Sequence, residues 1–151
     1  MPDKLHDKVH RINCLTEEVD SLYHQAALRL GVSDSVLFVL YMLHINGEKC
    51  LLYDTYKESG ISKQTINSAV RKLENEGIVY LEKHNGKSKI VCLTEKGKNY
   101  VGQTAAKLAE AECQAFSDWS EEEIDMYLQL IMKHDTSLRR QSEKLSIWRK
   151  K

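Results

Sequence analysis

The sequence predicts a mainly helical chain with one β-hairpin, an α+β protein in which α dominates. One proline and seven glycines in 151 residues leave long stretches free to form helices. Two β-prone runs, residues 78–81 and 89–93, flank an Asn85-Gly86 pair. Because Asn-Gly between such runs is a strong hairpin signal, we expect two antiparallel strands here, joined by a loop of two or more residues.

The first 47 residues predict two helices. Gly31 ends the first helix, at residues 5–30, and Ser33 is the expected N-cap of the second. The second helix contains an apolar run at residues 36–43 and therefore belongs in the core. The first helix has a narrow apolar seam of residues spaced by seven: Leu5, Ile12, Val19 and Ala26.

The middle of the chain predicts short elements separated by tight turns. An extended stretch at residues 49–51 precedes a brief helix at residues 52–59 and a turn at Gly60. Ser62 is the expected N-cap of another helix, which ends near Glu76 before Gly77. The hairpin follows directly.

The C-terminal third predicts two long helices. The first runs from Thr94 to about Phe116, and the second begins with a capping box at residues 120–123. The second helix has another seam of residues spaced by seven: Ile124, Ile131, Leu138 and Leu145. The rest of so small a chain cannot easily cover two such seams, so we expect the terminal helices to form a homodimer.

The helix at residues 62–76 has an unusual polar face. Its apolar residues Ile66, Ala69, Val70 and Leu73 fall on one side and must face the core. The other side offers amides, hydroxyls and cations, the groups that read base edges in the major groove of DNA. The candidate DNA-reading residues are Ser62, Lys63, Gln64, Thr65, Asn67, Ser68 and Arg71.

A short helix, a glycine turn, a second helix and a hairpin together predict a winged helix-turn-helix. The second helix of this motif enters the major groove of DNA. The hairpin tip is small and basic and is expected to contact the sugar-phosphate backbone. Its candidate residues are Asn85, Gly86, Lys87, Ser88 and Lys89.

The charge distribution supports this position for a DNA-binding surface. The chain has 22 basic and 22 acidic residues, but their balance is −3 over residues 1–56, +4 over residues 57–98 and −1 over residues 99–151. DNA responds to a local basic surface rather than to total charge.

Several motifs resemble those of the MarR family of winged-helix regulators. They occupy residues 60–65, 70–74, 77–79 and 93–97, and the order of helices extends the resemblance to about residues 5–145. The resemblance implies a homodimer that binds a pseudo-palindromic operator in double-stranded DNA. It divides the chain into a dimerisation helix at 1–32, a DNA-binding region at 33–98 and dimerisation helices at 99–151.

The wing departs from the family pattern. Members often have Asp-x-Arg where this chain has Asn85 and Lys87. Lysine keeps the charge but lacks the planar fork of arginine that suits a narrow minor groove. We therefore expect this wing to bind the DNA backbone rather than to read bases.

Four cysteines lie 36, 42 and 21 residues apart with no CxxC pair, so we expect buried free thiols rather than a zinc site or a disulfide framework. His6, His10 and Cys14 share one strip of the first helix, but without a fourth ligand we expect no metal there. Peroxide-sensing members of the resembled family carry a reactive cysteine in this helix, which makes Cys14 a redox candidate. Their supporting tyrosine pair has no counterpart here.

Two interpretations remain open for a group of aromatic and histidine side chains. In one interpretation, implied by the resemblance, these side chains line a cavity for a small-molecule effector. In the other, they pack as ordinary aromatic residues whose polar tips have hydrogen-bond partners. The residues are Tyr23, His24, Tyr41, His44 and Tyr53.

The remaining expectations concern the class of protein. No phosphate loop, nucleophile elbow or paired-carboxylate motif occurs, so we expect neither an enzyme nor a cofactor. The absence of an apolar leader or span predicts a cytoplasmic protein with no membrane partner. The function predicted is that of a sequence-specific transcriptional regulator. The alternative is a winged-helix module that docks a protein instead of DNA.

Overall fold

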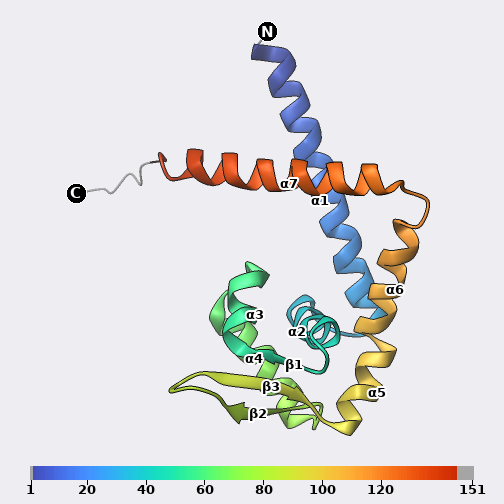
Figure 1. The fold of residues 1–151 in the computed structure, drawn as a ribbon, viewed down its shortest axis with the longest axis vertical. Helices are drawn as coiled ribbons and strands as arrows, with labels where there is room; N and C mark the ends of the chain where they lie inside the picture. The colour runs from blue at the N-terminus through green and yellow to red at the C-terminus, as the bar shows by residue number, and fades with distance from the viewer. Residues whose placement is uncertain (1, 146–151) are drawn as a thin grey trace. The chain divides into compact units, whose positions relative to one another are not determined.

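The computed structural model describes residues 2–145 and confirms the predicted fold class: a mainly helical chain with a winged helix-turn-helix (Figure 1). The elements, in chain order, are α1 (Pro2–Leu30), α2 (Asp34–Ile45), β1 (Lys49–Leu51), α3 (Leu52–Ser59), α4 (Lys63–Asn75), β2 (Val79–Lys83), β3 (Lys89–Leu93), α5 (Glu95–Gln103), α6 (Ala105–Ala115) and α7 (Glu121–Ser142).

The chain forms two compact units, one up to Glu110 and one from Ala111 onward. The first contains the sheet and helices α1 to α5, together with the start of α6. The second contains the end of α6 and α7.

Local hydrogen bonds set the helix starts, as the sequence predicts. The hydroxyl of Ser33 accepts from the amide of Val36 at 3.2 Å, and the hydroxyl of Ser62 accepts from the amide of Thr65 at 3.2 Å. Ser120 and Glu123 form the reciprocal capping box at the start of α7. Each cap satisfies backbone donors that the first turn of a helix leaves unpaired.

The three strands form one antiparallel sheet in the order β1-β3-β2. Val91 in the central strand lies opposite Cys50 of β1 and Leu81 of β2. Residues 84–88 join β2 to β3, so the hairpin loop has more than two residues. A hydrogen bond from the amide of His84 to the carbonyl of Ser88, at 2.9 Å, closes this loop.

The core of the first unit forms around α2, whose Leu40 and Leu43 are fully buried. The predicted inner face of α4 packs into the same cluster, with Ile66 and Leu73 also fully buried. Close packing on this face fixes which residues α4 presents outward. Helix α4 therefore has a single rotational setting.

The predicted continuous helix from Thr94 to about Phe116 is wrong, because the chain breaks at Thr104 into α5 and α6. Thr104 has φ −125° and ψ −91°, outside the helical region. Its hydroxyl donates to the carbonyl of Tyr100 at 2.8 Å, and its amide bonds to Val101 instead of Tyr100. A threonine that bonds back to the preceding turn competes with the helical backbone pattern.

The expectation of four buried thiols is also wrong in part. Cys50 and Cys92 are buried, whereas Cys14 is half-buried and Cys113 is exposed. All four are free, as expected. Cys113 lies near the end of α6, where Gln114 and Ala115 are exposed as well.

The two terminal helices expose apolar side chains. On α1, Ile12 is 50% exposed and Leu22 is 61% exposed. On α7, Ile131 is 48% exposed, and none of the residues of this helix is buried. Within residues 2–145, no single helix is long and apolar enough to cross a membrane.

Candidate nucleic-acid interface

The outer face of α4 is a polar surface that extends from its N-cap toward its last turn. Six of the seven candidate reading residues are exposed and Asn67 is half-buried. The four residues assigned to the inner face are all buried. The structure thus brings the predicted reading residues together on one side of one helix.

Three hydroxyls on this face have partners within the helix. The hydroxyl of Ser62 lies 2.8 Å from that of Thr65, besides capping the helix. The hydroxyl of Ser68 donates to the carbonyl of Gln64 at 3.0 Å. These bonds stabilise the first turns of the helix. Arg71, farther along the same face, is exposed.

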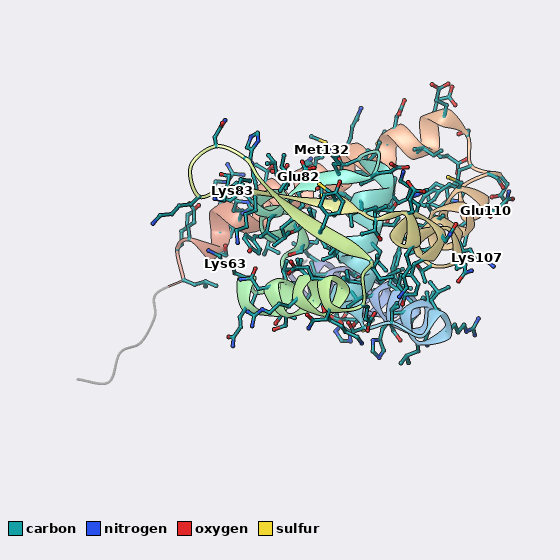
Figure 2. All side chains as sticks on the ribbon, turned by 90° about the horizontal axis from the view of Figure 1, so that it is seen from below. Lys63, Glu82, Lys83, Lys107, Glu110 and Met132 are labelled. Atoms are coloured by element: carbon teal, nitrogen blue, oxygen red, sulfur yellow. The ribbon has the colours of Figure 1, made fainter. Side chains whose placement is uncertain are left out.

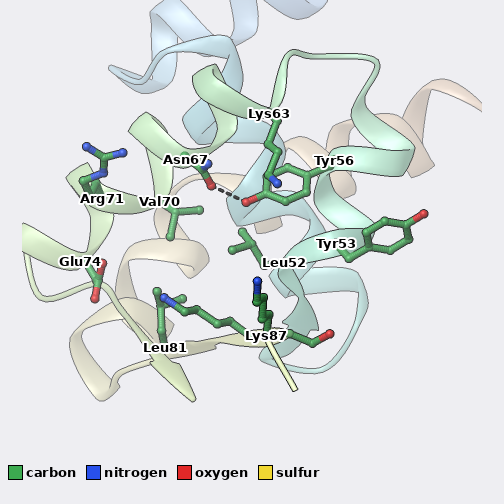
Figure 3. Close-up of a pocket in the computed structure, with 12 residues that line it drawn as sticks. Leu52, Tyr53, Tyr56, Lys63, Asn67, Val70, Arg71, Glu74, Leu81 and Lys87 are labelled. Carbon is green, nitrogen blue, oxygen red and sulfur yellow. Dashed lines mark hydrogen bonds between the residues drawn. The ribbon is translucent and has the colours of Figure 1, made fainter. Parts of the chain in front are cut away.

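A tyrosine on α3 contacts two of the reading residues (Figure 3). The hydroxyl of Tyr56 donates a hydrogen bond to the Oδ1 atom of Asn67. The Nζ atom of Lys63 lies 5.3 Å from the centre of the Tyr56 ring, within range of a cation–π interaction. Burial raises the pKa of the Tyr56 hydroxyl above its ordinary value of 10.0, so the group stays protonated at neutral pH.

A groove of about 540 Å³ runs between α4 and the hairpin (Figure 3). Four of its side chains are cationic and one, Glu74, is acidic. This excess of positive charge in a concave surface suits a polyanion. The lining residues are Leu52, Tyr53, Tyr56, Lys63, Asn67, Val70, Arg71, Glu74, Leu81, Lys87, Ser88 and Lys89.

The hairpin tip exposes all five predicted wing residues, Asn85, Gly86, Lys87, Ser88 and Lys89. Gly86 has φ +60°, in the left-handed region that glycine adopts without strain. The structure adds two exposed basic side chains to the wing, Lys83 at the end of β2 and His84. Figure 2 shows Lys63 and Lys83 at the surface of the molecule.

The proposed effector residues occupy three helices. Tyr53 lines the groove. Tyr23 and His24 belong to α1, and Tyr41 and His44 belong to α2. The Nδ1 atom of His24 lies 2.9 Å from a carboxylate oxygen of Asp34, which joins the end of α1 to the start of α2.

The first-helix strip places one histidine beside the cysteine. The Sγ atom of Cys14 lies 3.6 Å from the Nε2 atom of His10. Among residues 2–145, no group of three or more histidine, cysteine, aspartate or glutamate residues could hold a metal ion.

The sequence interpretation missed Tyr56 and Glu74 as groove residues. Glu74 falls at the edge of the polar face on the helical wheel, as the one acid there, but was not assigned to the site. Tyr56 reaches this site only because α3 packs against α4, and no spacing rule within one helix predicts that contact.

No protein-family model and no curated protein matches the sequence. The structure, in contrast, matches many solved structures. A MarR family regulator from Neisseria meningitidis has a TM-score of 0.79 at 15% identity, covering 91% of this chain and 99% of that one. A complex of MepR from S. aureus with DNA has a TM-score of 0.63 at 20% identity, covering 85% and 96%.

A third solved structure is the PcaV transcriptional regulator from Streptomyces coelicolor in complex with its natural ligand. It has a TM-score of 0.61 at 14% identity, covering 82% of this chain and 91% of that one. The fold and the site thus define a winged helix-turn-helix protein. More specifically, the chain has the fold of the MarR family of transcriptional regulators, which confirms the predicted resemblance at the level of the fold.

Proposed function

We propose that the chain is a MarR-family transcriptional regulator that binds double-stranded DNA as a homodimer on a pseudo-palindromic operator. Helix α4 reads base edges in the major groove, and the hairpin contacts the phosphate backbone. The observation that supports this most strongly is the cationic groove between α4 and the hairpin, which contains Lys63, Arg71, Lys87 and Lys89. The S. aureus MepR structure is a complex with DNA, which agrees with this function.

The roles of the individual residues follow from their positions. Arg71 is exposed on the outer face of α4, where a guanidinium can pair with guanine O6 and N7. Lys87 and Lys89 lie on the hairpin side of the groove and provide charge for phosphates. Because the inner face of α4 packs into the core, the outward side chains of this helix are held in fixed positions relative to the DNA.

A homodimer supplies the second reading helix. The exposed apolar residues of α1 and of α7 provide the surfaces that two copies would bury. In such a dimer the two α4 helices lie about 34–36 Å apart, which matches successive major grooves on one side of the duplex. Residues 1–32 and 99–151 are the dimerisation segments in this proposal, and residues 33–98 bind DNA.

We further propose that a small-molecule effector changes the spacing of the two reading helices. The PcaV structure contains its natural ligand, which agrees with effector binding on this fold. The candidate residues are Tyr23 and His24 on α1 and Tyr41 and His44 on the adjoining helix α2, whereas Tyr53 of α3 lines the groove beside α4. An effector that binds one conformation of the dimer more tightly than the other changes the fraction of dimers whose α4 helices are spaced to bind DNA.

A DNA-binding experiment tests the function directly. Purified protein is titrated against a pool of duplexes with randomised centres at several salt concentrations. We expect selection of a pseudo-palindromic sequence and an affinity that falls as salt rises, because phosphate contacts release counterions. The alternative, a winged-helix module that docks a protein, predicts no binding to any duplex at moderate salt.

A further inference from the structure

Tyr56 holds the oxygen end of the Asn67 amide. An asparagine side chain carries one acceptor oxygen and two N–H donors. Because the hydroxyl of Tyr56 donates to Oδ1, the oxygen faces α3 and the N–H donors remain for a ligand in the groove (Figure 3). The contact joins α3 to α4 across eleven residues of sequence.

The geometry places the Tyr56 hydroxyl as donor and Oδ1 of Asn67 as acceptor. Both residues are half-buried, which partly shields this bond from solvent. A hydrogen bond shielded from solvent is stronger than an exposed one and costs more to break. Rotating the Asn67 amide would break this bond and turn an N–H group toward the phenol oxygen instead.

We propose that Tyr56 is a positioning residue that presents Asn67 to DNA as a hydrogen-bond donor. This inference rests on the proposed function and specifies the bases that α4 selects. A free asparagine pairs with adenine through both ends of its amide, accepting from N6 and donating to N7. Tyr56 occupies one of the two acceptor positions of Oδ1 and turns the oxygen toward α3, so Asn67 favours base edges that only accept, namely guanine O6 and N7 or thymine O4.

The same tyrosine also contacts Lys63. The ring of Tyr56 lies beneath the ammonium group of Lys63. Lys63 precedes Asn67 by one turn of α4. Tyr56→Phe keeps this ring and removes only the hydroxyl. The variant therefore isolates the effect on Asn67 from the packing of α3 and from the cation–π contact.

The experiment compares base preferences selected from the randomised duplex pool. Asn67→Ala first identifies the operator position that Asn67 reads, as the position whose preference it abolishes. At that position we expect the wild type to favour guanine or thymine over adenine. We expect Tyr56→Phe to raise the relative selection of adenine by roughly tenfold, the scale of one base contact.

Tyr53→Phe is the matched control. Tyr53 lies on the same helix and lines the same groove, but its hydroxyl has no hydrogen-bond partner within residues 2–145. We expect its base preference to equal that of the wild type. Base preference is a ratio within one sample, so a change in the amount of folded protein does not alter it.

Combining the substitutions supplies a second measurement. In the Asn67→Ala background, Tyr56→Phe should have no further effect on base preference, because its partner is gone. A wild type that binds no duplex overturns the proposed function and this inference together. A wild type that selects duplexes while Tyr56→Phe keeps its preference, or that favours adenine at the Asn67 position, overturns this inference alone.

Discussion

The hydroxyl of Thr94 lies 2.5 Å from the carbonyl oxygen of Gly77, to which it donates a hydrogen bond. The same hydroxyl accepts from the amide of Gly97 at 2.9 Å and so caps α5. The ammonium of Lys96 donates to the carbonyl of Glu76 at 2.8 Å. One short motif after β3 therefore anchors the residues that follow α4, which keeps α4 and the hairpin in fixed relation.

Gly97 is the residue that lets this anchor close. A Cβ atom at Gly97 would lie 2.0 Å from the carbonyl oxygen of Ile78. Gly97→Ala should lower the free energy of unfolding by about 1–2 kcal/mol, because an overpacking cost of up to about 3 kcal/mol exceeds the gain of about 1 kcal/mol in helix propensity. Urea denaturation with fluorescence detection measures this change.

Gly102→Ala is the control for this prediction. It lies on the same helix, and a Cβ atom there meets nothing within 4 Å. Helix propensity alone then predicts stabilisation by about 0.5–1 kcal/mol. Changes of opposite sign in the free energy of unfolding would support the close contact between Gly97 and Ile78. Equal changes for the two variants would show that this contact does not require glycine at position 97.

Arg71→Ala tests base readout by α4. If the guanidinium pairs with a base, its removal should cost about 1–3 kcal/mol of binding to the selected operator. Binding to unrelated duplexes should fall much less, so the ratio of specific to non-specific affinity decreases. Fluorescence anisotropy with both duplexes measures this ratio. An equal loss on both duplexes would assign Arg71 to the phosphate backbone instead.

Lys87→Ala tests backbone contact by the wing. Loss of one phosphate contact should weaken binding to all duplexes alike and reduce the slope of log affinity against log salt by about 1. Lys107→Ala is the control, because Lys107 is an exposed lysine on α6. A change in base preference without a change in salt slope would show that the wing reads bases.

Much of the fold could be predicted because its signals are local. Ser33, Ser62 and Ser120 cap their helices within three residues of sequence, and the inner face of α4 follows from one helical wheel. The break at Thr104 was missed because apolar spacing continues across it. A side chain that bonds back to the preceding turn leaves no mark in hydrophobic periodicity.

The candidate site was predictable only in part, for a related reason. The reading residues share one helix, so their grouping follows from period 3.6. The groove depends on how α3, α4 and the hairpin pack, and these contacts join residues far apart in sequence. The partnership of Tyr56 with Asn67 is set by that packing and therefore needed the structure.

Ile12→Glu tests the dimer surface of α1. Ile12 belongs to the apolar seam and is 50% exposed, so a charge there should prevent two copies from burying this face. We expect a monomer by light scattering and loss of operator binding. Ser21→Glu, an exposed position of the same helix outside the seam, should remain dimeric. A wild type that is monomeric, or an Ile12→Glu variant that stays dimeric, would contradict the role of α1.

The thiols provide a test of burial that requires no DNA. Thiolate is the reactive form of cysteine, and burial raises the pKa of Cys50 to about 12, while the pKa of Cys92 is also raised, again mainly by burial. In native protein at pH 8 we therefore expect a thiol reagent to label Cys113 and Cys14 first, and Cys50 and Cys92 only after unfolding. Mass spectrometry of digested protein locates the labels over time.

Raising the pH to 9 should leave Cys50 unlabelled, because that pH is still well below its pKa. Labelling of Cys50 as fast as Cys113 in folded protein would show that β1 opens readily, and would contradict the packing of the sheet against α2.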